Sequence, residues 1–276
     1  MKILQASTTR GGATGLLSKR VFRLLPNNSQ QGPISDIEPL TGQQDGTITT
    51  SSNDLSNHVY QLLSGPIFAF YCRLQALSRE IAKLTLYHRS RTTSRDQQEV
   101  VDRMAALKED LHALWTSRSV TQCQPADELH AQLAPAIAQR IVSLIAICNA
   151  AYYAELVEMG RQLGDPLSRL PDSRDALHKI RETVDREVQR GAGTSHTSTV
   201  NPGFLRPLFL YAIESTEPHQ TQWAVDRIAQ IEPRIYRGQF FSTFAKELAG
   251  AQIEKERRVT SRYFCIWYFG VSPPYM

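Results

Sequence analysis

Cysteine is scarce in this chain of 276 residues, and its four positions lie far apart: Cys72, Cys123, Cys148 and Cys265. There is no Cys-x-x-Cys pair, and no cysteine and histidine have zinc-finger spacing. These absences exclude a disulfide scaffold and a zinc module. Cys72, Cys148 and Cys265 lie in apolar runs, which predicts buried free thiols in a reducing compartment.

A strong excess of one charge is lacking as well. Lys and Arg number 31, and Asp and Glu number 27, so the formal net charge is +4. That excess is too small to predict a nucleic-acid-binding surface by itself. Basic residues gather in three short groups, of which the second is either a nuclear-import or phosphate contact or an ordinary basic loop. The groups are Arg79/Lys83, Arg89/Arg91/Arg95 and Lys255/Arg257/Arg258.

Long uninterrupted apolar runs do not occur. Residues Met1–Ser7 turn polar too early for a signal peptide. The longest apolar run, Ile141–Val157, is interrupted by Ser143, Asn149 and Glu155. It is shorter than the roughly 20 residues that a membrane helix needs. We therefore expect a core helix in a soluble, intracellular protein that does not bind membranes.

Catalytic signatures are lacking too. Gly11–Gly15 has no Lys-Ser/Thr ending of a phosphate-binding loop, and neither the nucleophile-elbow motif nor the His-Glu-x-x-His zinc motif occurs. The seven histidines are scattered. Four of them fall on predicted helices, where we expect them near the solvent edge: His58, His112, His130 and His178.

Two pairs of neighbouring carboxylates are candidate metal ligands: Glu155 with Glu158, and Asp127 with Glu128. Di-metal sites in helical bundles need Glu-x-x-His motifs on facing helices, and none is found. The pairs are therefore predicted to be solvated or locally paired, for example with Arg161. We predict no catalytic, cofactor-binding, metal-binding or DNA-binding residue, no cofactor and no enzymatic activity.

The chain divides into two parts by composition. Residues 1–52 are rich in Gly, Ser, Thr, Gln and Asn, which predicts a mostly disordered polar segment. Within it Leu16–Leu25 mixes basic and apolar residues, as in a short helix or a docking peptide. Residues 53–276 carry apolar residues three and four apart, which predicts a helical domain.

We expect the first helix to end at Gly65-Pro66 and a second to cover Ile67–His88. Ser94 and Gln97 form a capping-box pattern that opens the next helix. Its apolar face favours packing on other helices, with a dimeric coiled coil as the alternative. This face comprises Val101, Met104, Leu107, Leu111, Leu114 and Trp115.

Pro125 suits the start of the helix with the longest apolar face. Pro135 should kink or split this helix, and Gly164-Asp165-Pro166 should end it. Another helix covers Ala176–Val188. These patterns predict an all-α fold of antiparallel helix pairs around one core, as a bundle or an irregular solenoid-like array.

The C-terminal third holds a helical hairpin at Phe204–Ile228, broken at Ser215–Pro218. We expect one further helix over Phe240–Tyr263, with Phe244, Leu248 and Ile253 inward and Lys255–Arg258 exposed. Strand-like alternation is seen only in Phe264–Phe269. The aromatic groups are predicted to be core, with an apolar effector pocket as the alternative. They are Tyr152-Tyr153, Phe240-Phe241 and Tyr263–Phe269.

The hairpin carries a resemblance to a known family. Pro207–Ser215 (PLFLYAIES) followed by Gln222–Ile228 (QWAVDRI) is similar to the end of the helical regulatory domain of fungal transcription factors with a Zn2Cys6 binuclear cluster. The helix ending Glu158–Arg161 and the stretch Asp102–Trp115 match that domain in character. The resemblance covers residues 60–276 and is closest to the subgroup that includes an acriflavine-sensitivity regulator.

Within the motif, Arg206 stands where the family favours Trp, and Ile213 where it has Gly. The six cysteines that hold two zinc ions in the family are lacking here. No zinc-binding or DNA-contacting residue can be carried over, and direct specific DNA binding is not expected. The chain is then a fragment or truncated gene product, or a member without its DNA reader.

The resemblance implies a nuclear protein that acts on transcription, including that of secondary metabolism, through protein partners, a homodimer or a small apolar effector. The alternative is an unrelated helical module or an enzyme with an apolar ligand pocket.

Overall fold

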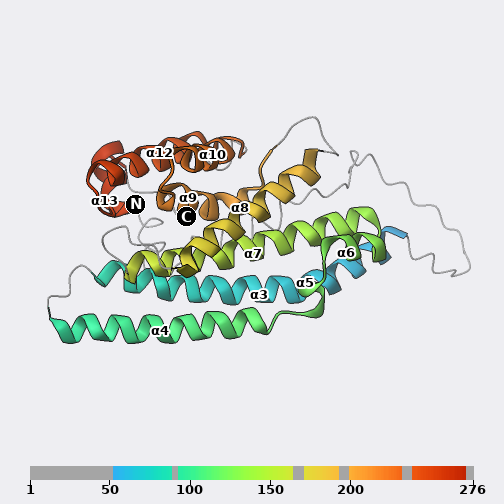
Figure 1. Cartoon of the computed structure of the whole chain (residues 1–276). Helices are drawn as coiled ribbons and strands as arrows, with labels where there is room; N and C mark the ends of the chain where they lie inside the picture. The colour runs from blue at the N-terminus through green and yellow to red at the C-terminus, as the bar shows by residue number, and fades with distance from the viewer. Residues whose placement is uncertain (1–51, 89–92, 164–170, 193–198, 232–237, 272–276) are drawn as a thin grey trace, which may run out of the picture.

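The computed structural model describes residues 52–88, 93–163, 171–192, 199–231 and 238–271, and these are almost entirely helical (Figure 1). The only β-type pairing among them is one isolated bridge between Val200 and Ile231. The all-α prediction is confirmed. The helices are α3 (Ser52–His88), α4 (Ser94–Thr116), α5 (Val120–Cys123), α6 (Ala126–Gln132), α7 (Pro135–Leu163), α8 (Pro171–Ala192), α9 (Leu205–Glu214), α10 (Pro218–Ala229), α12 (Gly238–Glu254) and α13 (Ser261–Phe269), with a 3-10 turn at Pro202–Phe204.

The helices form two groups that meet at α7 and α9. In the first group α3 lies between α4 and α7, and α8 crosses α7 (Figure 1). In the second group α9, α10 and α12 contact one another, and α13 lies against α12. Because α9 also contacts α7 and α8, one continuous apolar core runs through both groups.

Helix α3 does not end at Gly65-Pro66, so that prediction is wrong. A proline inside a helix loses the hydrogen bond to the carbonyl four residues earlier, here that of Leu62. Leu62, Gly65 and Pro66 are all exposed, so water can satisfy that carbonyl. Buried Ile67 and Phe70 follow directly and hold the helix against its neighbours. Tertiary packing overrides the local breaking signal.

The start and the inward face of α4 both differ by one residue from the expectation. The N-cap is Thr93, whose hydroxyl accepts a hydrogen bond from the backbone N–H of Asp96 at 3.2 Å. Val100 is buried, whereas Val101 is 45% exposed. The remaining predicted core residues of α4, from Met104 to Leu114, are buried.

Pro135 splits the long apolar face into α6 and α7, as predicted, and Pro125 is the N-cap of α6. Within α7 the segment Pro135–Arg161 is long and apolar enough to cross a membrane, which corrects the shorter run read from the sequence. However, 72% of its most apolar window is buried inside the fold. It is the core helix that we expected.

The segment after α10 forms two helices rather than the single helix predicted for Phe240–Tyr263. Helix α12 ends at Glu254, Glu256 has a left-handed φ of 47°, and α13 begins at Ser261. Ile253 is 54% exposed and Arg258 is buried, both opposite to expectation. The run Phe264–Phe269 is helical and not a strand.

Cysteine burial follows the prediction at two of three positions. Cys148 and Cys265 are buried and free, whereas Cys72 lies on the exposed side of α3. The four helical histidines are exposed as expected. Of the polar segment predicted at 1–52, residues 1–51 lie outside the described residues, and Ser52 is the first residue of α3. Also outside them are Arg89 and Arg91, the stop at 164–166 and the terminal residues 272–276.

Candidate functional site at the α9–α10 hairpin

The hairpin predicted at Phe204–Ile228 is present, as α9 followed by α10, and it lies where the two helix groups meet. Every residue of α9 is buried except Arg206. A helix that is apolar on all sides belongs inside a fold, since it has no face to offer to water. Helix α9 is therefore the axis around which the neighbouring helices pack.

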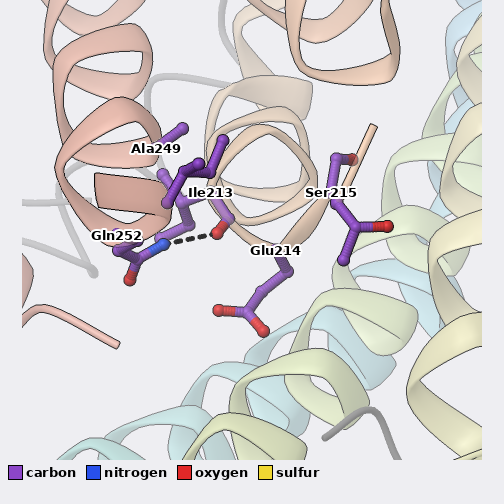
Figure 2. Close-up of a pocket in the computed structure, with 7 residues that line it drawn as sticks. Ile213, Glu214, Ser215, Ala249 and Gln252 are labelled. Carbon is purple, nitrogen blue, oxygen red and sulfur yellow. Dashed lines mark hydrogen bonds between the residues drawn. The ribbon is translucent and has the colours of Figure 1, made fainter. Parts of the chain in front are cut away.

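Side chains from three elements satisfy the last carbonyls of α9. The hydroxyl of Ser215 donates to the carbonyl of Tyr211 at 2.7 Å, and that of Thr221 donates to the carbonyl of Ala212 at 3.2 Å. The amide of Gln252, on α12, donates to the carbonyl of Ile213 at 2.6 Å (Figure 2). Helix ends leave such carbonyls without partners, and buried ones are costly. The carbonyls of Tyr211, Ala212 and Ile213 therefore each have a side-chain partner.

Gln252 makes a second hydrogen bond, through its side-chain oxygen. Its side-chain oxygen accepts a hydrogen bond from the backbone N–H of Val259 at 3.1 Å. The residue is buried. A single amide thus joins the end of α9, the body of α12 and the segment that leads into α13.

Two charged residues that the sequence places inside apolar runs pair with each other. Glu155, on α7, is only 1% exposed. It accepts two hydrogen bonds from the Arg206 guanidinium of α9, at 3.1 and 3.0 Å. Burial acts to lower the pKa of Arg206, but the charges of Glu155 and Glu158 outweigh it and raise that pKa. The Arg206 guanidinium therefore stays charged beside the Glu155 carboxylate.

A second set of charges continues from this pair. Arg161 lies 4.0 Å from Glu158 on the same helix and 2.8 Å from Glu214 at the end of α9. Arg258 also pairs with Glu214, at 3.0 Å. With Glu155 and Arg206, the group holds three glutamates and three arginines, so its charges balance. We call these six residues the Glu–Arg network.

The observed partners of the carboxylates differ in part from those predicted from the sequence. Glu158 has its local partner Arg161, as predicted, and Asp127 and Glu128 are solvated. Glu155 is neither solvated nor locally paired, because its partner is 51 residues away. Sequence reasoning missed Arg206, Arg258 and Gln252 as site residues. The signal that could have found the first pair is the single glutamate within the apolar run Ile141–Val157 and the arginine that directly precedes the apolar run Pro207–Ile213.

A small cavity opens beside the network. Its volume is about 220 Å³, and its walls come from the hairpin corner and from α12 (Figure 2). The lining residues are Ile213, Glu214, Ser215, Thr216, Ala249, Gln252 and Ile253. Glu214 is held by Arg161 and Arg258, so its carboxylate is already engaged. The arrangement suits a structural joint better than proton transfer.

Nucleophilic and metal chemistry find no better location in the described residues. Burial raises the pKa of the Cys148 thiol, which donates to the carbonyl of Ile67, so it stays protonated. Burial likewise raises the pKa of Tyr71. No group of three or more His, Cys, Asp or Glu side chains suited to a metal ion occurs in the part of the chain that the structure describes.

Trp223 ties α10 to α8. Its indole N–H donates to the Asp185 carboxylate at 3.2 Å, and its ring lies 5.0 Å from that of Tyr211. Arg181 and Arg227 flank the same carboxylate, at 3.6 and 3.5 Å. Trp223 is thus an anchor with a polar end, and not a free contact residue.

No family model, curated protein or solved structure matches this chain.

Proposed function

We propose that this chain is a helical regulatory domain of the kind found in fungal Zn2Cys6 transcription factors, acting in the nucleus through protein partners or a homodimer. The observation that carries the proposal is the α9–α10 hairpin. The residues that resemble the family, Pro207–Ser215 and Gln222–Ile228, are those that hold the two helix groups together.

The departure at Arg206 is compatible with this proposal. The family favours Trp at this position, and here the charge that replaces it is neutralised by Glu155. A balanced pair of this kind keeps the junction intact, because an unpaired buried carboxylate is strongly destabilising. The departure therefore changes the chemistry of the joint but not its role.

The mechanism that we propose is a population shift between two arrangements of the helix groups. The two groups are held together partly by polar contacts, from Arg206 of α9 to Glu155 of α7 and from Trp223 of α10 to Asp185 of α8. Such contacts are directional, so a partner or effector that binds near them can favour one arrangement over the other. A regulatory rather than catalytic role is part of the proposal.

A tethering experiment tests it. The full chain is fused to an unrelated DNA-binding domain, and expression is measured from a reporter that carries its operator. We expect a several-fold change, up or down, relative to the DNA-binding domain alone. A folded, nuclear fusion that leaves the reporter unchanged would contradict the proposal.

Direct DNA binding is expected to be weak, because phosphate attraction without base contacts gives affinities that fall steeply with salt. A gel-shift titration of the isolated chain should lose its complex when salt is raised from 50 to about 200 mM. A sequence-specific complex that survives this change would mean that the chain carries its own DNA reader.

A further inference from the structure

A second cavity, of about 330 Å³, lies in the first helix group, between the α5–α6 segment, α7 and α8. It shares no residue with the hairpin corner or the Glu–Arg network. Its volume falls at the small end of the range for ligand pockets. We call it the α6–α8 groove.

The floor of the groove is apolar. Leu129 from α6 and Val142, Ile145 and Ala146 from α7 line it, and all four are buried. An apolar floor of this kind favours a ligand with a hydrocarbon or aromatic body, because burying apolar surface there is favourable. An inorganic ion would instead lose its hydration shell without gaining a partner on the floor.

The rim carries three guanidinium groups: Arg118 follows α4, and Arg186 and Arg190 lie on α8. Arg118 stacks on the Trp115 ring at 3.4 Å and donates to the Trp115 carbonyl at 2.9 Å. Within the described residues it forms no salt bridge. Stacking holds the group in place while leaving donors for another acceptor.

The other two arginines have carboxylate partners, but these do not exhaust their donors. Arg186 pairs with Glu182 and Arg190 with Glu187, each at 2.5 Å. Glu182 is shared with Lys179, at 2.9 Å. The three rim arginines thus face two carboxylates, one of which is shared with Lys179, so positive charge is in excess at the mouth of a groove whose floor is apolar.

We propose that the α6–α8 groove binds a small monoanion with an apolar body, a medium-chain or aryl carboxylate, with its carboxylate on the arginine rim and its body on the floor. Asn149, which also lines the groove, adds a polar side chain between α7 and α8. This site goes beyond the proposed role in transcription, and its binding can be measured whether or not that role holds.

Calorimetric titration with three ten-carbon probes tests the charge requirement. Decanoate, decanol and decyltrimethylammonium share the tail and differ in the head. We expect decanoate to bind at least about tenfold more tightly than the other two, since charge-assisted hydrogen bonds are stronger than neutral ones. Equal affinity for decanoate and decanol, or no binding of decanoate, would overturn the proposal.

Substitutions locate the head group. R118Q should weaken decanoate binding about tenfold, and R186Q, at an exposed position, about threefold. R174Q removes the same charge from an exposed residue of α8 outside the groove and should have no effect. Decanoate binding that is equal in R118Q, R186Q and R174Q would place the ligand elsewhere.

Thiol protection locates the site without any substitution. Cys123 lines the groove and is exposed, whereas Cys72 is exposed on α3 and outside it. Saturating decanoate should slow the alkylation of Cys123 and leave the alkylation rate of Cys72 unchanged. Peptide mass spectrometry measures both rates. Equal protection of both thiols, or of neither, would contradict binding in the groove.

Discussion

Helices α9 and α13 have similarly apolar sequences, LRPLFLYAIE and SRYFCIWYF, but opposite surroundings. Helix α9 is buried on all sides, and its two charged residues are paired. Helix α13 buries Phe264 and Cys265 and exposes Tyr263, Ile266, Trp267 and Tyr268. Apolar composition therefore does not decide burial. What decides it is whether other helices are available on every side.

The largest expected effect is a difference in stability loss between α9 and α13 when one aromatic side chain in each is truncated to alanine. Phe209 is 2% exposed and packs against Phe241 and Phe244, so F209A should cost about 3–5 kcal/mol in free energy of unfolding. Trp267 is 83% exposed, and W267A should stay within about 0.5 kcal/mol of the parent. Urea denaturation measures both. Similar losses would mean that α13 is as well packed as α9.

Next in size is the loss of the charge on α9. R206M should lower the free energy of unfolding by about 2–4 kcal/mol, because it leaves the buried Glu155 carboxylate without its partner. The substituted side chain itself is 26% exposed, so the loss comes mainly from Glu155. The double variant E155M/R206M should recover most of the loss. If the double variant is no more stable than R206M, the loss does not come from an unpaired Glu155 carboxylate.

The contact that joins the two regions comes third. Q252L leaves the carbonyl of Ile213 and the N–H of Val259 without their partner, which should cost about 1–3 kcal/mol. The same change at exposed Gln239 on α12 is the matched control. We also expect faster proteolysis between residues 255 and 260 in Q252L, but not in Q239L.

The last prediction involves no expected change in stability and compares the exposure of the tryptophans by fluorescence quenching. The rings of Trp115 and Trp223 are partly buried in aromatic and cationic contacts, while Trp267 is exposed with the Lys255 ammonium 6.0 Å from its ring. Iodide should therefore quench mainly Trp267, and W267F should lose most of the quenching at an unchanged melting temperature. Quenching that persists in W267F would place another indole in solvent.

Much of the fold could be predicted because it depends on local signals. The break at Ser215–Pro218 and the split at Pro135 have chain-breaking residues at the point of the break. Pro66 shows the limit of such signals, since packing of Ile67 and Phe70 keeps α3 continuous. The break after Glu254 has no proline or glycine to announce it.

The candidate site was less predictable than the fold for a physical reason. The hairpin could be found because its residues are contiguous. The Glu155–Arg206 and Glu214–Arg258 pairs join residues 51 and 44 positions apart, and no single sequence states which distant charges meet. A lone charge within an apolar helix indicates that a partner exists, but it does not say where.

The bidentate contact between Glu155 and Arg206 also constrains how this protein can vary. A substitution at one position alone leaves an orphaned charge, so the two positions are expected to change together in natural variants. Where a homologous chain carries the Trp that the resemblance associates with position 206, position 155 should be uncharged. The joint between α7 and α9 would then be inherited as a matched pair of residues, and aligned sequences alone would reveal it.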